Sequence, residues 1–565
     1  MEETPPSPDR SRSPDSESNP LEEVFAPRKF LAFAGTLVVG RSLPLRRLQL
    51  WMGASRRRTV LSAAIAAALF LLLLELWQLL FIHPVPATPL ELGRQLYNSG
   101  HYTASAQQLR QELSSHPRET EARFLLAQNL IALQQWPAAN AALDELLKSA
   151  PNDPWVYYWL GQLQLGDNRP NDAAASWQLI LSRTDPAAQA VKPGTQLALG
   201  SLRFQQGAYD EASRLLYEGI ANNNGVEAIQ LQQAYYQYGL LLARDLRFDD
   251  AVSTLQRAMN VSLPGNQWEN ARLHLQQNNL LDKAQTLLTH LPEAAGEKVE
   301  GARRAKLAYA FILAEEYRPA EEQLLQVLRA APSYADARAY LGIIYWRTGK
   351  TDRAVSTLNA ALALSPSSRL ARQALAELLI DKLSLATGQT AETDGYKQDS
   401  ERARILLESL VNERPDDAAL QVTMARYYIA RHDYQHAQQY YENAIALNKS
   451  HPVQGLNPQA TLSRFYSETA FDPCVRGVDA GLDATKAQPD DPESWYAAGQ
   501  AYSLCGHPSL AVPMYEKALE LRQYWPDALY HLGQAYDTLK RKADADRVFS
   551  LLADLDPTRV FQRQQ

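Results

Sequence analysis

The sequence of 565 residues contains only two cysteines. So few thiols exclude a disulfide-dense scaffold, a zinc ribbon and an iron–sulfur site built on this chain alone. Catalytic signatures are missing as well: there is no glycine-rich phosphate loop ending in Lys-Ser/Thr, no Gly-x-Ser-x-Gly elbow, and no His-Glu-x-x-His or Cys-x-x-Cys motif. We therefore expect a protein that is not an enzyme and that binds no cofactor and no metal ion.

A basic surface is also lacking. The formal net charge is −7, and residues 1–58 hold ten basic and seven acidic side chains, which leaves 46 basic and 56 acidic side chains in the rest of the chain. A mildly acidic body does not suit phosphate groups, so we expect no nucleic acid among the partners. Phenylalanine and glycine are scarce, with 13 and 26 residues, although 46% of the residues are hydrophobic. This composition is typical of helices rich in alanine and leucine.

One long hydrophobic run is present. Residues 59–82, TVLSAAIAAALFLLLLELWQLLFI, form 24 residues without Lys, Arg, Gly or Pro. As a helix they would reach about 36 Å, which is enough to cross a hydrocarbon layer of about 30 Å. A buried core helix would show a polar face, which Ala63 to Leu74 lacks, and a signal peptide would have a shorter apolar part and a cleavage site, which the residues after Ile82 do not offer. We predict an uncleaved transmembrane signal anchor in a lipid bilayer.

The charged flanks of this run indicate its orientation. Arg46, Arg47 and residues 56–58, all arginine, precede it, whereas the first basic residue after it is Arg94. Because the basic flank stays in the cytosol, the N-terminus is expected to be cytoplasmic and the rest of the chain extracytoplasmic; in a bacterium this means the inner membrane and the periplasm. Residues 1–29, rich in Pro, Ser and charge, are expected to be a disordered cytosolic tail. Residues 30–58 form a basic segment that either lies on the membrane surface or is a weakly ordered linker.

The most informative pattern is a repeat of 34 residues that fills most of the chain after residue 88. Its small residues let two short helices approach closely, and its proline ends the second helix. Such a pair cannot bury its apolar face alone, so neighbouring copies are expected to stack around a continuous core. Two copies show the period without a gap, because Leu307, Ala308, Phe311, Ala320, Leu324, Val327 and Pro332 recur as Leu341, Gly342, Tyr345, Ala354, Leu358, Ala361 and Pro366.

This pattern resembles the tetratricopeptide repeat over roughly residues 88–557. The resemblance implies an all-α fold: a right-handed α-solenoid of about 12–13 helix-turn-helix repeats, preceded by one transmembrane helix. We expect a first part at residues 88–381, a mobile inserted loop at 382–400 between two helices of one repeat, a second part at 401–557, and a C-terminal tail at 558–565. Trp268 with Ala284 is expected to mark a further helix pair, residues 449–473 fit the repeat poorly, and residues 184–194 are expected to form a longer connection.

In this family the first helices line the concave face of the solenoid, and positions 5 and 9 of the repeat point into it. Here these positions pair an aromatic ring with a glutamine in four copies. Aromatic faces beside amide groups suit the backbone of an extended peptide, although structural filling explains the same residues equally well. The resemblance thus implies a protein-binding surface that contains Phe124, Gln128, Tyr158, Gln162, Tyr496, Gln500, Tyr530 and Gln534.

The two cysteines lie in neighbouring repeats. The repeat pattern places Cys474 near the start of a second helix and Cys505 near the end of the next first helix, 31 residues later. In this architecture the two helix ends lie on the same edge of the stack, so an oxidising compartment would permit a disulfide between them. Two free, partly buried thiols are the alternative.

The anchor and the repeats together predict a membrane-tethered scaffold or adaptor whose partners are other proteins or peptides. One alternative is a subunit or assembly factor of an envelope export machine for exopolysaccharide or pili. A second is the repeat part of an enzyme similar to glycosyltransferases. The second is disfavoured because no stretch outside the repeats exceeds the N-terminal 88 residues, which is too few for a catalytic domain and an anchor.

Overall fold

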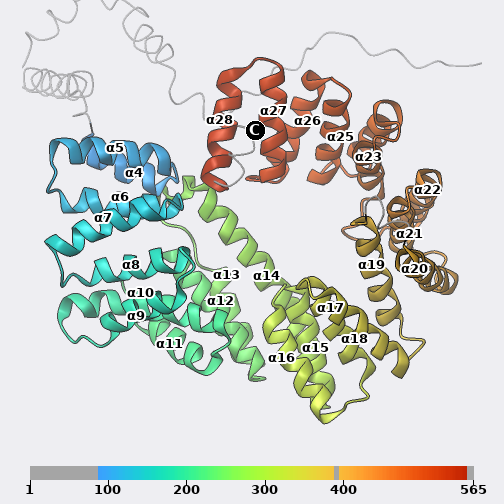
Figure 1. Ribbon diagram of the computed structural model, residues 1–565, viewed down its shortest axis with the longest axis horizontal. Coiled ribbons are helices and arrows are strands. Elements are labelled where there is room, and N and C mark those ends of the chain that lie inside the picture. The colour runs from blue at the N-terminus through green and yellow to red at the C-terminus, as the bar shows by residue number, and fades with distance from the viewer. Residues whose placement is uncertain (1–86, 387–392, 557–565) are drawn as a thin grey trace, which may run out of the picture. The chain divides into compact units, whose positions relative to one another are not determined.

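The computed structural model describes residues 87–386 and 393–556, except for the side chains of Asn266 and Trp268 (Figure 1). Within these ranges the chain forms 25 α-helices, one short 3-10 helix, one π-helical turn and no strand. The prediction of an all-α fold of stacked helix pairs is therefore confirmed.

Several predicted segments lie outside the described residues. They are the tail at 1–29, the basic segment at 30–58, the transmembrane helix at 59–82 and the C-terminal tail at 558–565. Among the residues that are described, none of the helices combines the length and the apolar character needed to cross a bilayer.

One helix, α14 (Ala271–Ala295), stands alone after a 3-10 helix, η1 (Gly265–Glu269), and the other 24 helices form twelve antiparallel pairs. The pairs before α14 are α4 (Pro89–Asn98) and α5 (Tyr102–Ser115), α6 (Thr120–Ala132) and α7 (Trp136–Ser149), α8 (Pro154–Gly166) and α9 (Pro170–Leu181), α10 (Pro186–Gln206) and α11 (Tyr209–Ala221), and α12 (Ala228–Arg244) and α13 (Phe248–Met259). The pairs after it are α15 (Glu300–Leu313) and α16 (Tyr317–Ala330), α17 (Ala335–Arg347) and α18 (Thr351–Leu364), α19 (Arg369–Ser384) and α20 (Asp394–Glu413), α21 (Ala418–Ala430) and α22 (Tyr434–Ser450), α23 (Pro458–Thr469) and α24 (Val478–Ala487), α25 (Pro492–Leu504) and α26 (Pro508–Leu521), and α27 (Pro526–Thr538) and α28 (Lys542–Leu555).

Pairs such as α17–α18 and α8–α9 are held by a large side chain of the second helix that fits against a small residue of the first. In α17 a Cβ added to Gly342 would stand 2.6 Å from Cγ of Leu358 in α18, so only glycine permits this approach. In α8 a Cβ on Gly161 would overlap the indole of Trp177, a fully buried side chain of α9. These small residues therefore set how closely the two helices of their pairs can pack.

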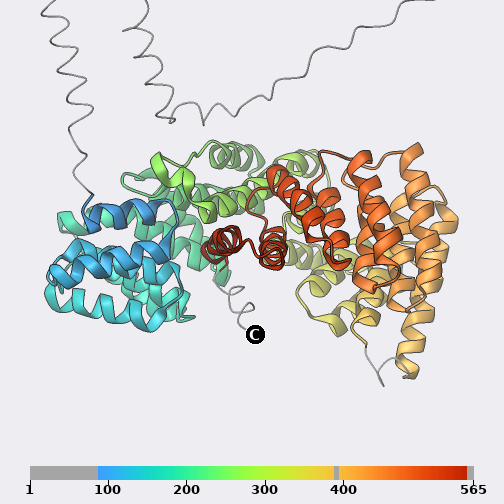
Figure 2. The ribbon, with the colours of Figure 1, turned by 90° about the horizontal axis from the view of Figure 1, so that it is seen from above.

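The first helices of neighbouring pairs pack on one another in three runs (Figures 1 and 2). The first run contains α4, α6, α8, α10, α12 and α14, the second contains α15, α17, α19 and α21, and the third contains α23, α25 and α27. The second helices lie behind them and enclose an apolar core whose largest part extends from Leu197 to Ala430. We call the outward surface of the first helices the first-helix face. The predicted binding residues belong to these first helices, on α6, α8, α25 and α27.

The predicted loop at 382–400 is wrong at both of its ends. Residues 382–384 complete α19, and residues 394–400 begin α20. The hydroxyl of Thr393 accepts a hydrogen bond from the backbone N–H of Tyr396 and caps α20, and Lys382 forms an ion pair with Asp399 at 2.6 Å. An N-cap satisfies backbone donors that would otherwise need water, so the insertion lengthens two helices instead of forming a loop throughout. Residues 387–392 lie outside the described part.

The longer connection predicted at 184–194 is also helical. Asp185 caps α10 by accepting a hydrogen bond from the N–H of Ala188 at 3.1 Å, and Pro186 occupies the first turn. Proline at the first helical position has a backbone angle already suited to a helix and loses no hydrogen bond there. The helix then continues through Pro193 and reaches 21 residues.

The helix pair predicted around Trp268 and Ala284 is instead the single 25-residue helix α14. Its second half replaces a second helix, because Ala284, Leu287 and Leu291 are buried in the main core. Its first half leaves that core, and Ala271 joins the apolar cluster of α25 to α28. The break in the repeat therefore joins parts of the array that are distant in sequence.

Candidate functional site

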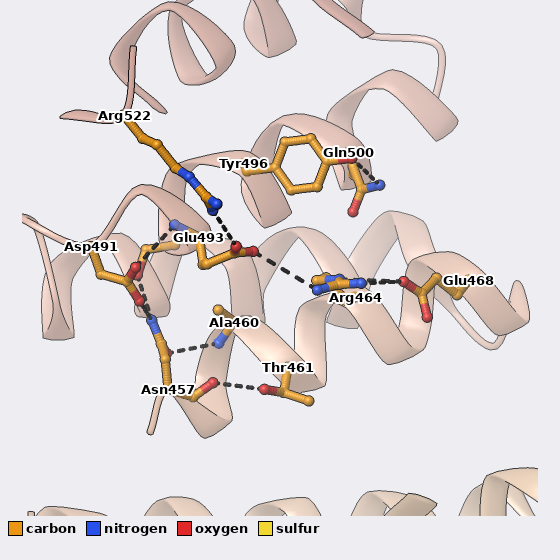
Figure 3. Close-up of polar contacts among 11 residues, drawn as sticks. Asn457, Ala460, Thr461, Arg464, Glu468, Asp491, Glu493, Tyr496, Gln500 and Arg522 are labelled. Atoms are coloured by element: carbon orange, nitrogen blue, oxygen red, sulfur yellow. Dashed lines mark hydrogen bonds and ion pairs between the residues drawn. The ribbon is translucent and has the colours of Figure 1, made fainter. Parts of the chain in front are cut away.

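The first helices of the last three pairs, α23, α25 and α27, each begin at a proline. Figure 3 shows polar side chains that connect this part of the first-helix face. Asn457, just before α23, donates hydrogen bonds to Asp491 at 2.6 Å and to the Ser494 hydroxyl at 2.7 Å at the start of α25. The same amide accepts a hydrogen bond from the N–H of Ala460 at 3.0 Å. One asparagine thus caps its own helix and fixes the start of the next one.

Charged side chains cross this face from helix to helix. The Glu493 carboxylate on α25 lies between two arginines, 3.8 Å from Arg464 on α23 and 3.4 Å from Arg522 before α27. Arg464 also contacts Glu468 at 3.0 Å. Burial raises the pKa of the Glu493 carboxyl, although both arginines act in the opposite direction. The charges compensate one another, so this part of the face has no strong excess of either sign.

Tyr496 and Gln500, two predicted binding residues, lie together on α25. The Gln500 amide donates a hydrogen bond to the Tyr496 hydroxyl at 3.1 Å, while its carbonyl oxygen is buried and has no hydrogen-bond partner among the described residues. The Tyr496 ring packs 4.5 Å from the Trp525 ring and is 6% exposed. Burial raises the pKa of Tyr496 to about 12. The Tyr496 side chain therefore lies beneath the first-helix face and contributes little to its exposed surface.

Tyr530 and Gln534, the next predicted pair, line a cleft of about 580 Å³ between α25, α27 and α28. Gln534 is exposed, and its carbonyl oxygen lies 3.3 Å from Nδ1 of His531. Ser503 and Asp537 complete the polar part of the lining, and Phe549 contributes an aromatic ring. The cleft thus offers aromatic faces and amide, imidazole and carboxylate groups within one opening.

The four other predicted residues lie in the first run, on α6 and α8. Phe124, Gln128 and Gln162 are half-buried, whereas Tyr158 is 8% exposed. The Tyr158 hydroxyl donates to Gln230 at 3.4 Å, and the Gln230 amide donates to the Gly194 carbonyl at 2.7 Å. Burial raises the pKa of Tyr158 to about 12. The eight residues therefore belong to two separate runs of first helices, and the two on α27 line the cleft of about 580 Å³.

A second cleft, of about 350 Å³, contains residues that the sequence did not single out. It lies between α10, α12 and α14, and Gln233, Gln237 and Asn279 give it an amide-rich lining. At its edge the Tyr236 hydroxyl donates to the Glu316 carboxylate at 2.9 Å. Gln233 and Gln237 lie one helical turn apart on α12. The position of Asn279 opposite them could not be predicted from the sequence, because α14 departs from the repeat.

Glu316→Gln is expected to remove part of the pH dependence of stability. Burial raises the pKa of the Glu316 carboxyl above 4.5, although Lys283 and Tyr236 act in the other direction. The folded state therefore binds more protons than the unfolded chain, so this contribution favours folding at low pH and is lost as the pH rises from about 4.5 through the raised pKa. The free energy of unfolding can be measured by urea unfolding followed by circular dichroism. Between about pH 4.5 and 7.5 it should fall by about 1 kcal/mol more for the wild type than for the variant.

Asp282→Asn is the matched control, because it removes an exposed carboxylate that precedes Lys283 on α14, whereas Glu315 itself raises the pKa of Glu316. That variant should retain the wild-type slope of stability against pH. Equal slopes for the wild type and Glu316→Gln would contradict a raised pKa at Glu316.

The two cysteines form a disulfide in the structure, with 5.3 Å between their Cα atoms. Cys474 lies in the π-helical turn η3 (Pro473–Gly477) before α24, and Cys505 ends α25. The Ser463 hydroxyl donates to the Gly477 carbonyl at 2.8 Å and holds the other side of the same turn. The bond thus joins the irregular start of α24 to the neighbouring helix pair.

Comparison with known families supports the predicted resemblance. One model of the tetratricopeptide repeat matches residues 90–154, 125–189 and 305–369, and another matches residues 492–524 and 526–559. These segments contain α4 to α9, α15 to α18 and α25 to α28. They therefore include all eight predicted binding residues.

Solved structures with similar helix pairs have low overall agreement with this chain, and no curated protein matches it. The Cut9–Hcn1 hetero-tetramer of the APC/C is 16% identical, with 88% of this chain and 97% of that chain covered and a TM-score of 0.34. Yeast Tom70 is 11% identical, with 84% and 98% covered and a TM-score of 0.34. A tetratricopeptide repeat protein from Parabacteroides merdae is 16% identical, with 46% and 93% covered and a TM-score of 0.33. At this level of agreement these structures carry no argument about function.

Proposed function

We propose that this chain, a tetratricopeptide-repeat protein, is an adaptor that binds partner polypeptides on its first-helix face while residues 59–82 hold it in a membrane, with the repeats on the extracytoplasmic side. The observation that carries the binding role is the cleft of about 580 Å³ lined by Tyr530 and Gln534. An extended peptide needs amide and hydroxyl groups for its backbone and apolar faces for its side chains, and this cleft offers both kinds of group.

Two observations support the location. The disulfide between Cys474 and Cys505 suits an oxidising compartment, because cytosolic thiols are kept reduced. The arginines that precede residue 59 have no basic counterpart before Arg94 on the far side of the hydrophobic run. This asymmetry favours a cytoplasmic N-terminus.

Gln534→Trp is expected to reduce the capture of partner proteins about tenfold, because the indole would fill the cleft and cost at least about 1.4 kcal/mol of binding. The full chain is crosslinked in intact cells with a membrane-impermeant reagent, purified and its partners identified by mass spectrometry. Gln523→Trp is the matched control, since Gln523 is exposed just before α27 but does not line the cleft.

The control should retain the wild-type partners. If Gln534→Trp retains them as well, the cleft is not the binding surface. If partners are captured only with a membrane-permeant reagent, the repeats are not extracytoplasmic and that part of the proposal is wrong.

A further inference from the structure

Three segments that are far apart in sequence meet at the start of α14 (Figure 1). Asn270 donates a hydrogen bond to the Tyr102 hydroxyl of the first helix pair at 3.0 Å. Arg272 donates to the Ala132 carbonyl at the end of α6 at 2.6 Å and to the Asp554 carbonyl near the end of α28 at 2.7 Å. The beginning, the middle and the end of the described array are thus joined around one arginine side chain.

The surroundings of Arg272 are those of a cation site. Its guanidinium lies 4.8 Å from the centre of the Tyr102 ring, and aromatic faces attract cations. Both of its carbonyl acceptors belong to the last turn of a helix, where carbonyl oxygens lack helical donors and carry the negative end of the helix dipole. Two helix ends and an aromatic ring therefore converge on one guanidinium.

The hydrogen-bonding capacity of the Arg272 guanidinium is not fully satisfied in this site. Its Nη2 atom is buried and has no hydrogen-bond acceptor among the described residues. The backbone of α14 fixes where the side chain can reach, whereas an arginine on a separate polypeptide can approach with its planar donors freely oriented. Few apolar contacts accompany the junction, since Ala271 and Leu275 are the residues of α14 that pack on the cluster of α25 to α28.

The site also lies at the end of a predicted binding row. Phe124, Gln128 and Ala132 are spaced by four residues on α6, so they share one side of that helix. A polypeptide that follows Phe124 and Gln128 along the first-helix face would therefore reach the Ala132 carbonyl, which Arg272 occupies.

We propose that Arg272 is an internal ligand of a guanidinium site formed by Tyr102 and the carbonyl groups of Ala132 and Asp554, and that a partner polypeptide binds by placing an arginine of its own in this site. The proposal rests on the proposed function, in which partners bind the first-helix face. It adds the chemistry of the partner, a segment that carries an arginine, and a consequence: occupation by the partner releases α14 from α6 and α28.

The test uses the full chain in detergent and N-acetyl-arginine methylamide as the probe. Arg272→Ala empties the site, so the variant should bind the probe at least tenfold more tightly than the wild type by calorimetry. The citrulline analogue has a similar shape but no charge and should not gain affinity. Arg247→Ala, which removes an exposed arginine that pairs with Asp250, is the control and should bind like the wild type. Equal affinity of Arg272→Ala and the wild type for the arginine probe would overturn the assignment.

Asn270→Ala keeps the proposal testable if Arg272→Ala does not fold. This variant removes the hydrogen bond to Tyr102 and the N-cap of α14 but retains Arg272, so it should weaken the internal ligand and raise probe affinity several-fold. Hydrogen exchange in the first turn of α14 should then increase when the arginine probe is added, and no change would count against the proposal. Probe binding without captured partners refutes the proposed function alone, whereas captured partners without probe binding refute the guanidinium site alone.

Discussion

Trp177→Ala is expected to destabilise the helix pair α8–α9 by about 3–5 kcal/mol. The indole is fully buried, and its N–H donates to the Tyr158 carbonyl at 3.1 Å. Its removal leaves a cavity beside Gly161, where no side chain can fill the space, and takes the indole donor from the Tyr158 carbonyl. In a stacked array each pair contacts mainly its neighbours, so the loss should be local. Hydrogen exchange of the full chain, read helix by helix, is the appropriate measurement.

Trp155→Ala is the matched control for this prediction. Trp155 belongs to the same helix pair and contacts Tyr158, but its side chain is 43% exposed. We expect the Trp155→Ala substitution to lower the stability of the helix pair by at most about 1 kcal/mol, because little apolar area is lost from the core. If both variants lower protection of α8 and α9 equally, the close fit between Gly161 and Trp177 does not hold the pair together.

The helix pairs were predictable because their determinants are local. The small residue of the first helix and the large residue of the second are 16 apart in regular copies, as in Gly342 with Leu358 and Gly161 with Trp177. A period of 34 residues repeats this contact along the chain, so the sequence displays it many times. The same argument predicted that Cys474 and Cys505 would lie on one edge, where the structure joins them.

The path of α14 was not predictable from the repeat. Residues 271–295 contain no glycine, and their one proline, Pro292, lies in the last turn, so nothing interrupts the helix where the repeat template requires a turn. The contacts of Asn270 and Arg272 with Tyr102, Ala132 and Asp554 span 168, 140 and 282 residues. No periodicity encodes such pairs, because each of them occurs once.

The pattern of positions 5 and 9 identified a helix face but not the exposure of its side chains. Tyr158 and Tyr496 occupy the same repeat position as Tyr530, yet both are buried, by Gln230 in one case and by Trp525 in the other. Burial depends on the neighbouring pair, which the repeat leaves variable. The binding role of these residues therefore stays a prediction that rests on the cleft at Tyr530 and Gln534.

Replacing both cysteines by serine is expected to lower the free energy of unfolding of the region around η3 by about 3–4 kcal/mol. The disulfide closes a loop of 31 residues, and the lost loop-closure entropy of the unfolded chain gives this magnitude. The effect should appear in α23, α24 and α25, because η3 packs against these three helices. Hydrogen exchange of the full chain under oxidising conditions is expected to show reduced protection there, with the pairs before α14 unchanged.

A reductant provides the control for the cysteine variant. It also tests whether the stability of these repeats depends on an oxidising compartment. Reduction of the wild type should reproduce the loss of protection, and the same treatment of the double serine variant should have no effect. If reduction leaves α24 as protected as before, hydrogen bonds such as that from Ser463 to Gly477 hold η3 without the disulfide. If protection is lost, the native packing of these repeats depends on an oxidised bond, and the reducing cytosol would not maintain it. The stability of one irregular turn would then bear directly on the kind of compartment in which the repeats fold.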